Sequence, residues 1–443
     1  MTSEAELLRT EAPPGWQVKR IKRLATTTPG AFTDGDWIES PYITNEGVRL
    51  LQTGNVGIGQ YKEQGYRFVT EETFRLLRCT EVRPGDVLIC RLADPVGRAC
   101  IAPDLGCRMI TSVDVAILKM QVEHDPRFLV YYLSSERYLG HLEAICRGGT
   151  RDRVSRSMLG DIPVLAPPRK EQDAIANFLD RKTAAIDALI AKKERLIELL
   201  QEKRQALITQ AVTKGLDPNV PMKESGMEWL GTVPAHWEVR PLKRLLAHGP
   251  KNGISPPPSD GVGVPSFSIS AVRDGRVDVM TNLKEVALPP AEARVYRMRK
   301  HDLLLVRGNG NLEMVGACGL VDEFPEGCTY PDILMLMRPS RDATPEFLVA
   351  AINSPYVRAQ IELAARTSNG TYKVSGEDVR SLLMVVPPVS EQQTITARVI
   401  AVDQTLGRLL GNVRLQTEKL REYRQALITA AVTGKIDVSK EAA

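Results

Sequence analysis

The sequence predicts an α+β protein with two mixed α/β globular domains, joined by two long helices that form an antiparallel coiled coil with pseudo-twofold symmetry. The main observation is a tandem duplication, in which motifs recur after about 220 residues. The second is that each copy ends in a long polar segment with helical periodicity. The third is a composition of 43% hydrophobic and 25% charged residues, which is typical of a folded globular chain.

The duplication divides each copy into a globular part and a helical part. The matched segments, given by their first residues, are WQVKRIKRL (Trp16) with WEVRPLKRL (Trp237), RPGDVLICR (Arg83) with RKHDLLLVR (Arg299), PPRKEQ (Pro167) with PPVSEQ (Pro387), and RQALITQAVT (Arg204) with RQALITAAVT (Arg424). We therefore expect globular domains at 1–166 and 232–386, helices at 167–214 and 387–434, a linker at 215–231 and a tail at 435–443.

The globular parts contain short apolar runs that follow turn residues, a pattern typical of buried strands. The predicted strands are 87–90 and 113–118 in the first copy, and 303–306 and 332–336 in the second. The segments 128–138 and 347–363 are predicted to be helical.

The helical parts begin with Pro-Pro followed by Glu-Gln, a pattern that favours a helix start. No Gly or Pro interrupts 171–213, which predicts a rod of about 65 Å at 1.5 Å per residue. Apolar residues at alternating steps of three and four predict a pairing seam. Its members are Leu179, Ile186, Leu189, Leu196, Leu200 and Leu207 in the first helix, and Val399, Val402, Leu406, Leu409, Val413, Leu420, Tyr423 and Leu427 in the second.

Three lysines interrupt the first seam, and Ile190 and Ile197 widen the apolar stripe beside it. The linker between the copies is short, so the second helix should begin near the end of the first, and the two should run antiparallel. The alternative is that the helices are separate spacers or hold unrelated partners. We favour the pair, because solitary helices with such seams need burial.

Several classes of function receive no support from composition or motifs. The net charge of +4 is weakly basic and does not by itself indicate a nucleic-acid partner. The sequence lacks a long apolar stretch and an apolar leader, and its seven cysteines form no CxxC pair, so we expect a reducing cytoplasm, with no membrane and no metal. A phosphate-binding GxxxxGK[ST] loop, HExxH and GxSxG are also missing. This pattern favours a binding protein over an enzyme.

The repeated motifs resemble the specificity (S) subunit of type I restriction-modification systems. The resemblance rests on PPRKEQ and PPVSEQ opening the helices, RQALITQAVTKGLD and RQALITAAVTGKID closing them, GMEWLGTVPAHWEVRPLKRL before the second domain, and GDVLICR and HDLLLVR. It covers nearly the whole chain. The first copy lacks the Glu-Trp-Leu-Gly lead that precedes the second.

This resemblance implies a non-catalytic DNA-binding subunit whose globular parts are target recognition domains, each reading half of a bipartite site in double-stranded DNA. The helices would bind two modification (methyltransferase) subunits, which direct adenine methylation with S-adenosylmethionine. Up to two restriction subunits, using ATP and Mg²⁺, would cleave DNA. No cofactor and no catalytic residue would then belong to this chain.

DNA contacts are expected on loops that differ between the copies, one after the matched strand (91–97 and 307–316) and one at GGTRDRVS and NGTYKVS. Arginine suits guanine or phosphate, and asparagine suits adenine. The candidates are Arg91, Arg147, Thr150, Arg151, Arg153, Arg156, Arg307, Asn309, Asn311, Thr371, Tyr372 and Lys373. The alternative is that these are solvated turn residues.

Two other functions remain open from the sequence. One is a coiled-coil scaffold that joins two protein-binding modules, and the other is an enzyme whose site carries no known motif. A steep fall of DNA affinity with salt would separate a DNA-binding subunit from the scaffold. A co-purified cofactor or activity of the isolated chain would indicate the enzyme.

Overall fold

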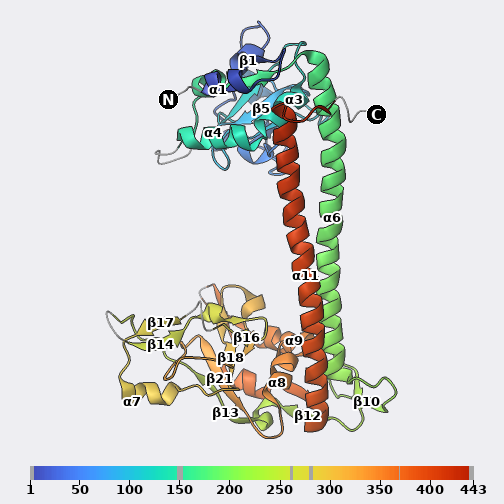
Figure 1. Ribbon diagram of the computed structural model, residues 1–443. Helices are drawn as coiled ribbons and strands as arrows, with labels where there is room; N and C mark the ends of the chain where they lie inside the picture. Colours follow the sequence, from blue (N-terminus) through green and yellow to red (C-terminus); the bar gives the residue numbers. More distant parts are fainter. Residues whose placement is uncertain (1–3, 147–152, 260–262, 279–282, 369, 439–443) are drawn as a thin grey trace. The chain divides into compact units, whose positions relative to one another are not determined.

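The computed structural model describes residues 4–146, 153–259, 263–278, 283–368 and 370–438 (Figure 1). The chain divides into two compact units, the first comprising Met1–Glu194 with Leu415–Ala443, and the second comprising Arg195–Arg414. Each unit therefore contains one globular part, the first half of the long helix that follows that part, and the last half of the other long helix.

The first unit is a mixture of short strands and helices around one core. In chain order its elements are α1 (Glu4–Glu11), β1 (Gln17–Arg20), β2 (Phe32–Asp34), β3 (Val48–Leu51), β4 (Phe68–Val69), α2 (Glu71–Leu76), β5 (Val87–Cys90), β6 (Ala99–Ile101), β7 (Met109–Thr111), β8 (Val115–Leu118), α3 (Pro126–Leu133), α4 (Glu136–Cys146), α5 (Arg156–Asp161), β9 (Pro163–Ala166) and α6 (Arg169–Lys214), which continues into the second unit.

The second unit repeats this order with additions. After α6 the chain forms β10 (Met222–Glu224), β11 (Thr232–Pro234), β12 (Glu238–Pro241), β13 (Leu246–Asn252), β14 (Val264–Phe267), β15 (Val272–Arg273), β16 (Arg276–Val277), β17 (Leu283–Val286), α7 (Pro290–Ala293), the short 3-10 helix η6 (Arg294–Tyr296), β18 (Leu303–Val306), β19 (Gly308–Asn309), β20 (Cys318–Leu320), β21 (Leu334–Pro339), α8 (Pro345–Ile352), α9 (Pro355–Ala364), β22 (Arg366–Ser368), β23 (Thr371–Lys373), α10 (Gly376–Ser381), β24 (Leu383–Val386) and α11 (Val389–Val432).

Sheet topology shows the duplication directly. The first unit has a four-stranded sheet in the order β2-β8-β5-β6, and the second has a six-stranded sheet that contains β21-β18-β20. The central strand pairs antiparallel with both neighbours in each sheet, and Ile89 lies opposite Ala116 as Leu305 lies opposite Met335. In each unit the strand before the long helix also pairs with the strand that opens the domain, β9 with β1 and β24 with β12.

The strands predicted at 87–90 and 303–306 are β5 and β18, and all eight residues are fully buried. That prediction rested on short runs of apolar residues that follow turn residues. The strands predicted at 113–118 and 332–336 both begin two residues later, at Val115 and Leu334.

The segments predicted to be helical at 128–138 and 347–363 are helical, and each is divided into two helices, α3 and α4 in the first copy and α8 and α9 in the second. In the second copy Ser354 is extended before Pro355, and proline cannot continue the hydrogen bonding of the preceding turn. In the first copy the break comes at Ser134 and Ser135, and the Ser135 hydroxyl donates to the Tyr132 carbonyl at 2.6 Å.

Each core joins a globular part to the ends of both long helices. In the first unit Trp16 and Phe178 of α6 cluster with Ile428 and Val432 of α11. In the second unit Trp237 clusters with Val212 of α6 and with Ile395 and Val399 of α11. The motifs that open one helix and close the other thus meet in one core, which explains why both motifs occur in both copies.

All seven cysteines are free thiols. None of the helices in the described part of the chain is both long and apolar enough to span a membrane. Within the same residues, no three His, Cys, Asp or Glu side chains gather in a group that could hold a metal ion.

Candidate nucleic-acid interface

In both copies, described residues of the two loops predicted to contact DNA are joined by backbone pairing. In the first unit the amide of Val154 donates to the carbonyl of Arg91 at 3.0 Å, and Leu92 bridges to Arg153. In the second unit the amide of Val374 donates to the carbonyl of Arg307, also at 3.0 Å. Each pair of variable loops therefore forms one surface at the carboxyl end of the central strand.

Arg91 is held inside the first unit. Only 5% of it is exposed, its guanidinium donates to the Val113 carbonyl at 2.7 Å, and its Nε lies 3.1 Å from Asp34. Asp34 also pairs with Arg156 at 3.3 Å. In this arrangement Arg91 supports the loops, whereas Arg156 is exposed at their edge.

Arg153 is exposed and pairs with Asp114 at 2.7 Å. Asp114 is half-buried, so only the arginine side of this pair faces solvent, and Arg153 would have to leave Asp114 to bind another anion with its full guanidinium. Arg147, Thr150 and Arg151 lie outside the described residues.

In the second unit the loops form a small sheet. β19 pairs with β23, so that Gly308 lies opposite Lys373 and Asn309 lies opposite Tyr372. β23 also pairs with β22. This pairing brings Asn309, Tyr372 and Lys373 together, as a shared site requires. Lys373 is exposed, while Thr371 and Tyr372 are half-buried and Tyr372 packs against the core.

Both candidate asparagines bond to nearby backbone. The Asn309 side-chain oxygen accepts from the Asn311 amide at 2.9 Å, and the Asn311 oxygen accepts from the Glu313 amide at 3.0 Å. Such turns shape the loop. Two-point pairing with adenine needs both the oxygen and the nitrogen of the side chain, so it requires these turns to open. Arg307 is half-buried beside them.

Sequence reasoning missed two arginines that hold these loops in place. Arg98, 8% exposed, donates to the carbonyls of Val56, Leu92, Pro95 and Thr53 at 2.7 to 2.9 Å. Arg98 thus ties both ends of the 91–97 loop to the domain. No motif marks it, because its partners are backbone carbonyls from distant segments.

Arg358 of α9 has the same role in the second unit. Its guanidinium donates to the carbonyls of Val315 and Glu313, the latter at 2.7 Å. At the end of each loop stands a glycine with positive φ, Gly97 (84°) and Gly316 (81°). A Cβ would lie 2.0 Å from Leu142 in the first case and 2.5 Å from Ile361 in the second, so both loops close tightly against a helix.

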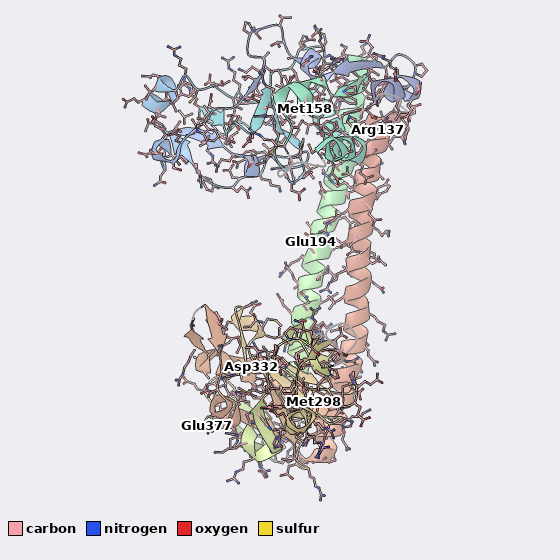
Figure 2. The ribbon with its side chains drawn as sticks, turned by 90° about the vertical axis from the view of Figure 1, so that its left-hand side faces the viewer. Arg137, Met158, Glu194, Met298, Asp332 and Glu377 are labelled. Carbon is pink, nitrogen blue, oxygen red and sulfur yellow. The ribbon has the colours of Figure 1, made fainter. Side chains whose placement is uncertain are left out.

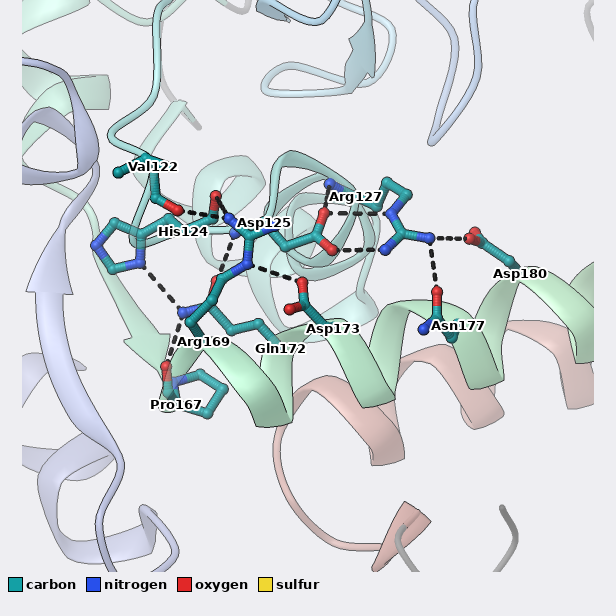
Figure 3. Close-up of polar contacts among 10 residues, drawn as sticks. All are labelled: Val122, His124, Asp125, Arg127, Pro167, Arg169, Gln172, Asp173, Asn177 and Asp180. Carbon is teal, nitrogen blue, oxygen red and sulfur yellow. Dashed lines mark hydrogen bonds and ion pairs between the residues drawn. The ribbon is translucent and has the colours of Figure 1, made fainter. Parts of the chain in front are cut away.

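The Glu-Gln motif at each helix start anchors the long helix to its globular part. Gln172, 2% exposed, donates to the Pro167 carbonyl at 2.7 Å and accepts from the Asp125 amide at 2.8 Å (Figure 3). Its amide nitrogen also lies 3.1 Å from Nδ1 of His124. Beside it Arg127 spans Asp125 and Asp180, which ties α3 to α6.

The second copy repeats this anchor. Gln392, fully buried, donates to the carbonyls of Pro387 and Asp342 and accepts from the Thr344 amide at 2.8 Å. In both copies the preceding glutamate accepts from the indole nitrogen of the repeated tryptophan, Glu171 from Trp16 at 2.9 Å and Glu391 from Trp237 at 3.0 Å. The repeated sequence therefore has a structural explanation at this point.

Within each unit the two helix segments run side by side in opposite directions. In the first unit Asp187 pairs with Arg424 at 2.8 Å and Glu194 of α6 pairs with Arg421 at 2.6 Å (Figure 2). In the second unit Arg204 pairs with Asp403 at 2.8 Å. Arg204 and Arg424 hold the same place in the repeated RQALIT motif, and each binds an aspartate of the other helix.

The seam follows different positions from those of a strict heptad. Of the predicted members, those buried are Leu179, Ile186, Val399, Val402 and Leu406, and those half-buried are Leu200, Leu207, Val413, Leu420 and Leu427. The exposed members are Leu189 (43%), Leu196 (43%), Leu409 (45%) and Tyr423 (57%).

Their neighbours line the seam instead. Ile190 and Ile197 of α6 are half-buried, and Leu410 and Thr417 of α11 are 7% and 3% exposed. The buried positions Val399, Val402, Leu406 and Leu410 have steps of three, four and four, because a straight helix drifts from a seven-residue repeat.

The fold defines a class of protein with two copies of a mixed α/β domain, each followed by a long helix. No family model matches the chain. It is 25% identical over 433 residues to the type I restriction enzyme EcoKI specificity subunit of Escherichia coli K12, covering 96% of this chain and 90% of that protein. Over 440 residues it is 20% identical to the StySPI specificity subunit of Salmonella potsdam, covering 97% and 90%.

Solved structures have the same fold. The HsdS subunit from Thermoanaerobacter tengcongensis matches with a TM-score of 0.52 at 16% identity, covering 96% of this chain and 98% of that one. A chain described under "Structural basis underlying complex assembly and conformational transition of the type I R-M system" matches with a TM-score of 0.73 at 16% identity, covering 96% and 99%. The predicted resemblance to type I specificity subunits is confirmed.

Proposed function

We propose that this chain is the non-catalytic specificity subunit of a type I restriction-modification complex and reads a bipartite DNA target. The observation that carries the proposal is the pair of variable loops that meet at the same place in both units. The surrounding framework is repeated, and its anchors differ little between copies. A shared framework with different loops is what two readers of different sequences require. The relatives named above are specificity subunits, which supports the same role.

Within this role, exposed residues on the paired loops would contact DNA. Arg153, Arg156 and Lys373 are exposed and would contact phosphates or base edges, and Arg151 is the further candidate from the sequence. The buried Arg91 would hold the loops that carry these residues in place. An Arg151→Ala variant should weaken binding to the first half-site only, and equal loss at both halves would contradict the assignment.

We further propose that α6 and α11 form an antiparallel coiled coil that holds the two readers at a fixed separation. The opposite direction of the helix segments within each unit supports this arrangement. Rigid linkage makes binding of the second half-site intramolecular, so two weak contacts give one specific complex. The unspecified spacer between half-sites would then follow from helix length, as dimer geometry fixes half-site spacing elsewhere.

Partner subunits would dock on the helices. In the first unit an apolar groove of about 460 Å³ lies between α6 and α11, lined by Leu189, Leu415 and Leu420 with lysines at its rim. Leu415 is 54% exposed. A partner that covers this groove would bury its exposed apolar surface. We propose that a modification subunit covers it and carries S-adenosylmethionine. ATP and Mg²⁺ would belong to a cleavage subunit.

The decisive experiment is co-expression of the chain with the modification subunit encoded beside it, followed by mapping of methylated adenines. The account predicts methylation at a bipartite motif with a constant spacer. Methylation at an undivided motif, or methylation that does not depend on this chain, would refute it.

A groove variant tests the partner site in the same system. Leu415→Glu should reduce co-purification of the modification subunit at least tenfold, because it places a charge in an apolar contact. Leu76→Glu provides the control, since Leu76 is 66% exposed on α2 and does not line the groove. Equal co-purification of both variants would exclude this groove.

A further inference from the structure

The second unit contains a cationic pocket that the proposed reading loops do not use. It has a volume of about 390 Å³, and its lining includes Arg294, Arg297, Arg299 and Arg338 together with His248 and Tyr330. None of the described lining residues is acidic. The pocket lies where the chain enters β18, and the loop of Arg307 and Asn309 follows the other end of that strand.

The floor of the pocket is rigid. Asp302, 1% exposed, binds Arg338 through two hydrogen bonds of 2.6 and 2.7 Å and accepts from the Arg299 amide at 2.7 Å. One carboxylate therefore orients Arg338 and fixes the turn that carries Arg299.

The rim is also held in place. Lys251 of β13 donates to the Val295 carbonyl at 2.8 Å, and its ammonium lies 4.9 Å from the centre of the Tyr296 ring. Met298 is buried in the core of the second unit (Figure 2). These contacts tie η6 and the residues after it to the sheet, so the backbone between Arg294 and Arg299 is positioned without any ligand.

Three of these arginines remain available. Arg294, Arg297 and Arg299 are exposed, and the structure gives their guanidinium groups no hydrogen bond or ion pair with the residues it describes. Three such cations gathered around one pocket repel each other unless an anion lies between them. The planar guanidinium suits phosphate oxygens in particular.

The first unit has a different arrangement at the same place. The repeat aligns Arg299 with Arg83, Asp302 with Asp86 and Arg297 with Glu81. Glu81 pairs with Arg108 at 3.0 Å and lies 3.9 Å from Arg83, so this turn is internally neutralised. The cationic pocket therefore arose in only one copy, and a purely structural need of the shared fold does not explain it.

We propose that this pocket binds a phosphate group. The favoured source is the backbone of the duplex whose second half-site would be read by the loops at the other end of β18, an assignment that rests on the proposed function. The other source is a free phosphate compound. Neither source requires a base contact, so the pocket would add affinity without adding sequence preference.

The first test uses pyrophosphate as the probe and does not depend on DNA binding. Calorimetric titration of the full chain at low salt should show binding that Arg297→Glu, which introduces the residue of the first copy, weakens at least tenfold. Arg398→Glu is the control, because it makes the same charge change on an exposed face of α11. Absence of pyrophosphate binding, or equal binding by Arg297→Glu and the unchanged chain, would overturn the proposal.

The second test identifies the source. For duplex DNA, the slope of log affinity against log salt is about −0.9 for each phosphate contact. An Arg297→Gln, Arg299→Gln variant that loses the phosphate of the pocket should therefore reduce the magnitude of this slope by about 0.9, with sequence preference unchanged. A lowered slope assigns the pocket to the duplex. An unchanged slope in this variant, together with pyrophosphate binding that the unchanged chain shows and the variant loses, assigns the pocket to a free phosphate compound. If the chain binds no DNA, the proposed function fails while the titration still decides the pocket.

Discussion

At the residue scale, two arginines, the buried Arg98 and the half-buried Arg358, determine the shape of the variable loops. Arg98 and Arg358 donate only to backbone carbonyls, so they hold a loop shape without constraining the loop sequence. Because the contacts are made to backbone carbonyls, the loop side chains can differ between the copies while the framework stays the same. The same side chains should therefore control which half-site each unit reads.

An Arg98→Lys variant tests this role. Lysine cannot reach four carbonyls from one planar group, so the first unit should lose about 1–3 kcal/mol of stability and most of its half-site selectivity. Arg358→Lys is the matched variant and should affect the second half-site alone. Binding to duplexes altered in one half-site measures the effect. Unchanged selectivity in Arg98→Lys would show that the loop holds its own shape.

His124 makes the helix anchor of the first unit sensitive to pH. Burial, followed by the nearby Lys19 ammonium, lowers the pKa of His124 below its ordinary value of 6.5. As the pH falls through 6.5, His124 therefore takes up a proton in the unfolded chain but stays neutral in the folded chain. The free energy of unfolding decreases as a result. Well above pH 6.5, His124 is neutral in both states and does not make the free energy of unfolding depend on pH.

The expected result is a lower melting temperature of the chain at pH 5.5 than at pH 7.5, with a smaller difference in His124→Gln. Measurements stay above pH 5, where Asp125, whose pKa is lowered, remains ionised. An identical pH difference in both proteins would assign the effect to other groups.

At the element scale, the long helices show how far sequence patterns reach. The motif Pro-Pro-x-x-Glu-Gln predicted both helix starts to within two residues of their observed positions. The prediction succeeded because proline and the buried glutamine determine the helix start through residues close to them in sequence. The register of the seam could not be predicted, since it depends on how one helix lies against the other. A strict heptad favours Leu409, whereas the structure buries Leu410.

This register is testable with neighbouring leucines. Leu410→Ala should cost about 2–3 kcal/mol, because it leaves a cavity in the seam. Leu409→Ala is the control and should cost less than about 1 kcal/mol, since Leu409 is 45% exposed. Chemical denaturation compares the two, and a larger loss for Leu409→Ala would restore the heptad register.

In the globular parts, too, features set by residues close in sequence could be predicted and features set by distant contacts could not. The strands at 87–90 and 303–306 were predictable because a continuous apolar run has only one stable environment. The candidate site was predictable only as two loops per copy. That Arg91 is buried, that both asparagines close turns, and that Arg98 supports the loop depend on distant backbone partners. The cationic pocket likewise required the folded positions of Arg299 and Arg338.

At the scale of the whole molecule, each unit combines the start of one long helix with the end of the other. This arrangement lets a duplicated sequence build two similar units from one chain, because each unit uses both repeated motifs once. Helix length, rather than loop sequence, would then set the separation of the two readers.

The measurement that tests this most directly is the spacer length of the methylated motif after one heptad is inserted into each long helix. Seven residues add about 10 Å, so the account predicts a spacer longer by about three base pairs with both half-sites unchanged. Seven residues inserted into the linker 215–231 provide the control and should leave the spacer as it was. A heptad variant that methylates with the original spacer would contradict the account.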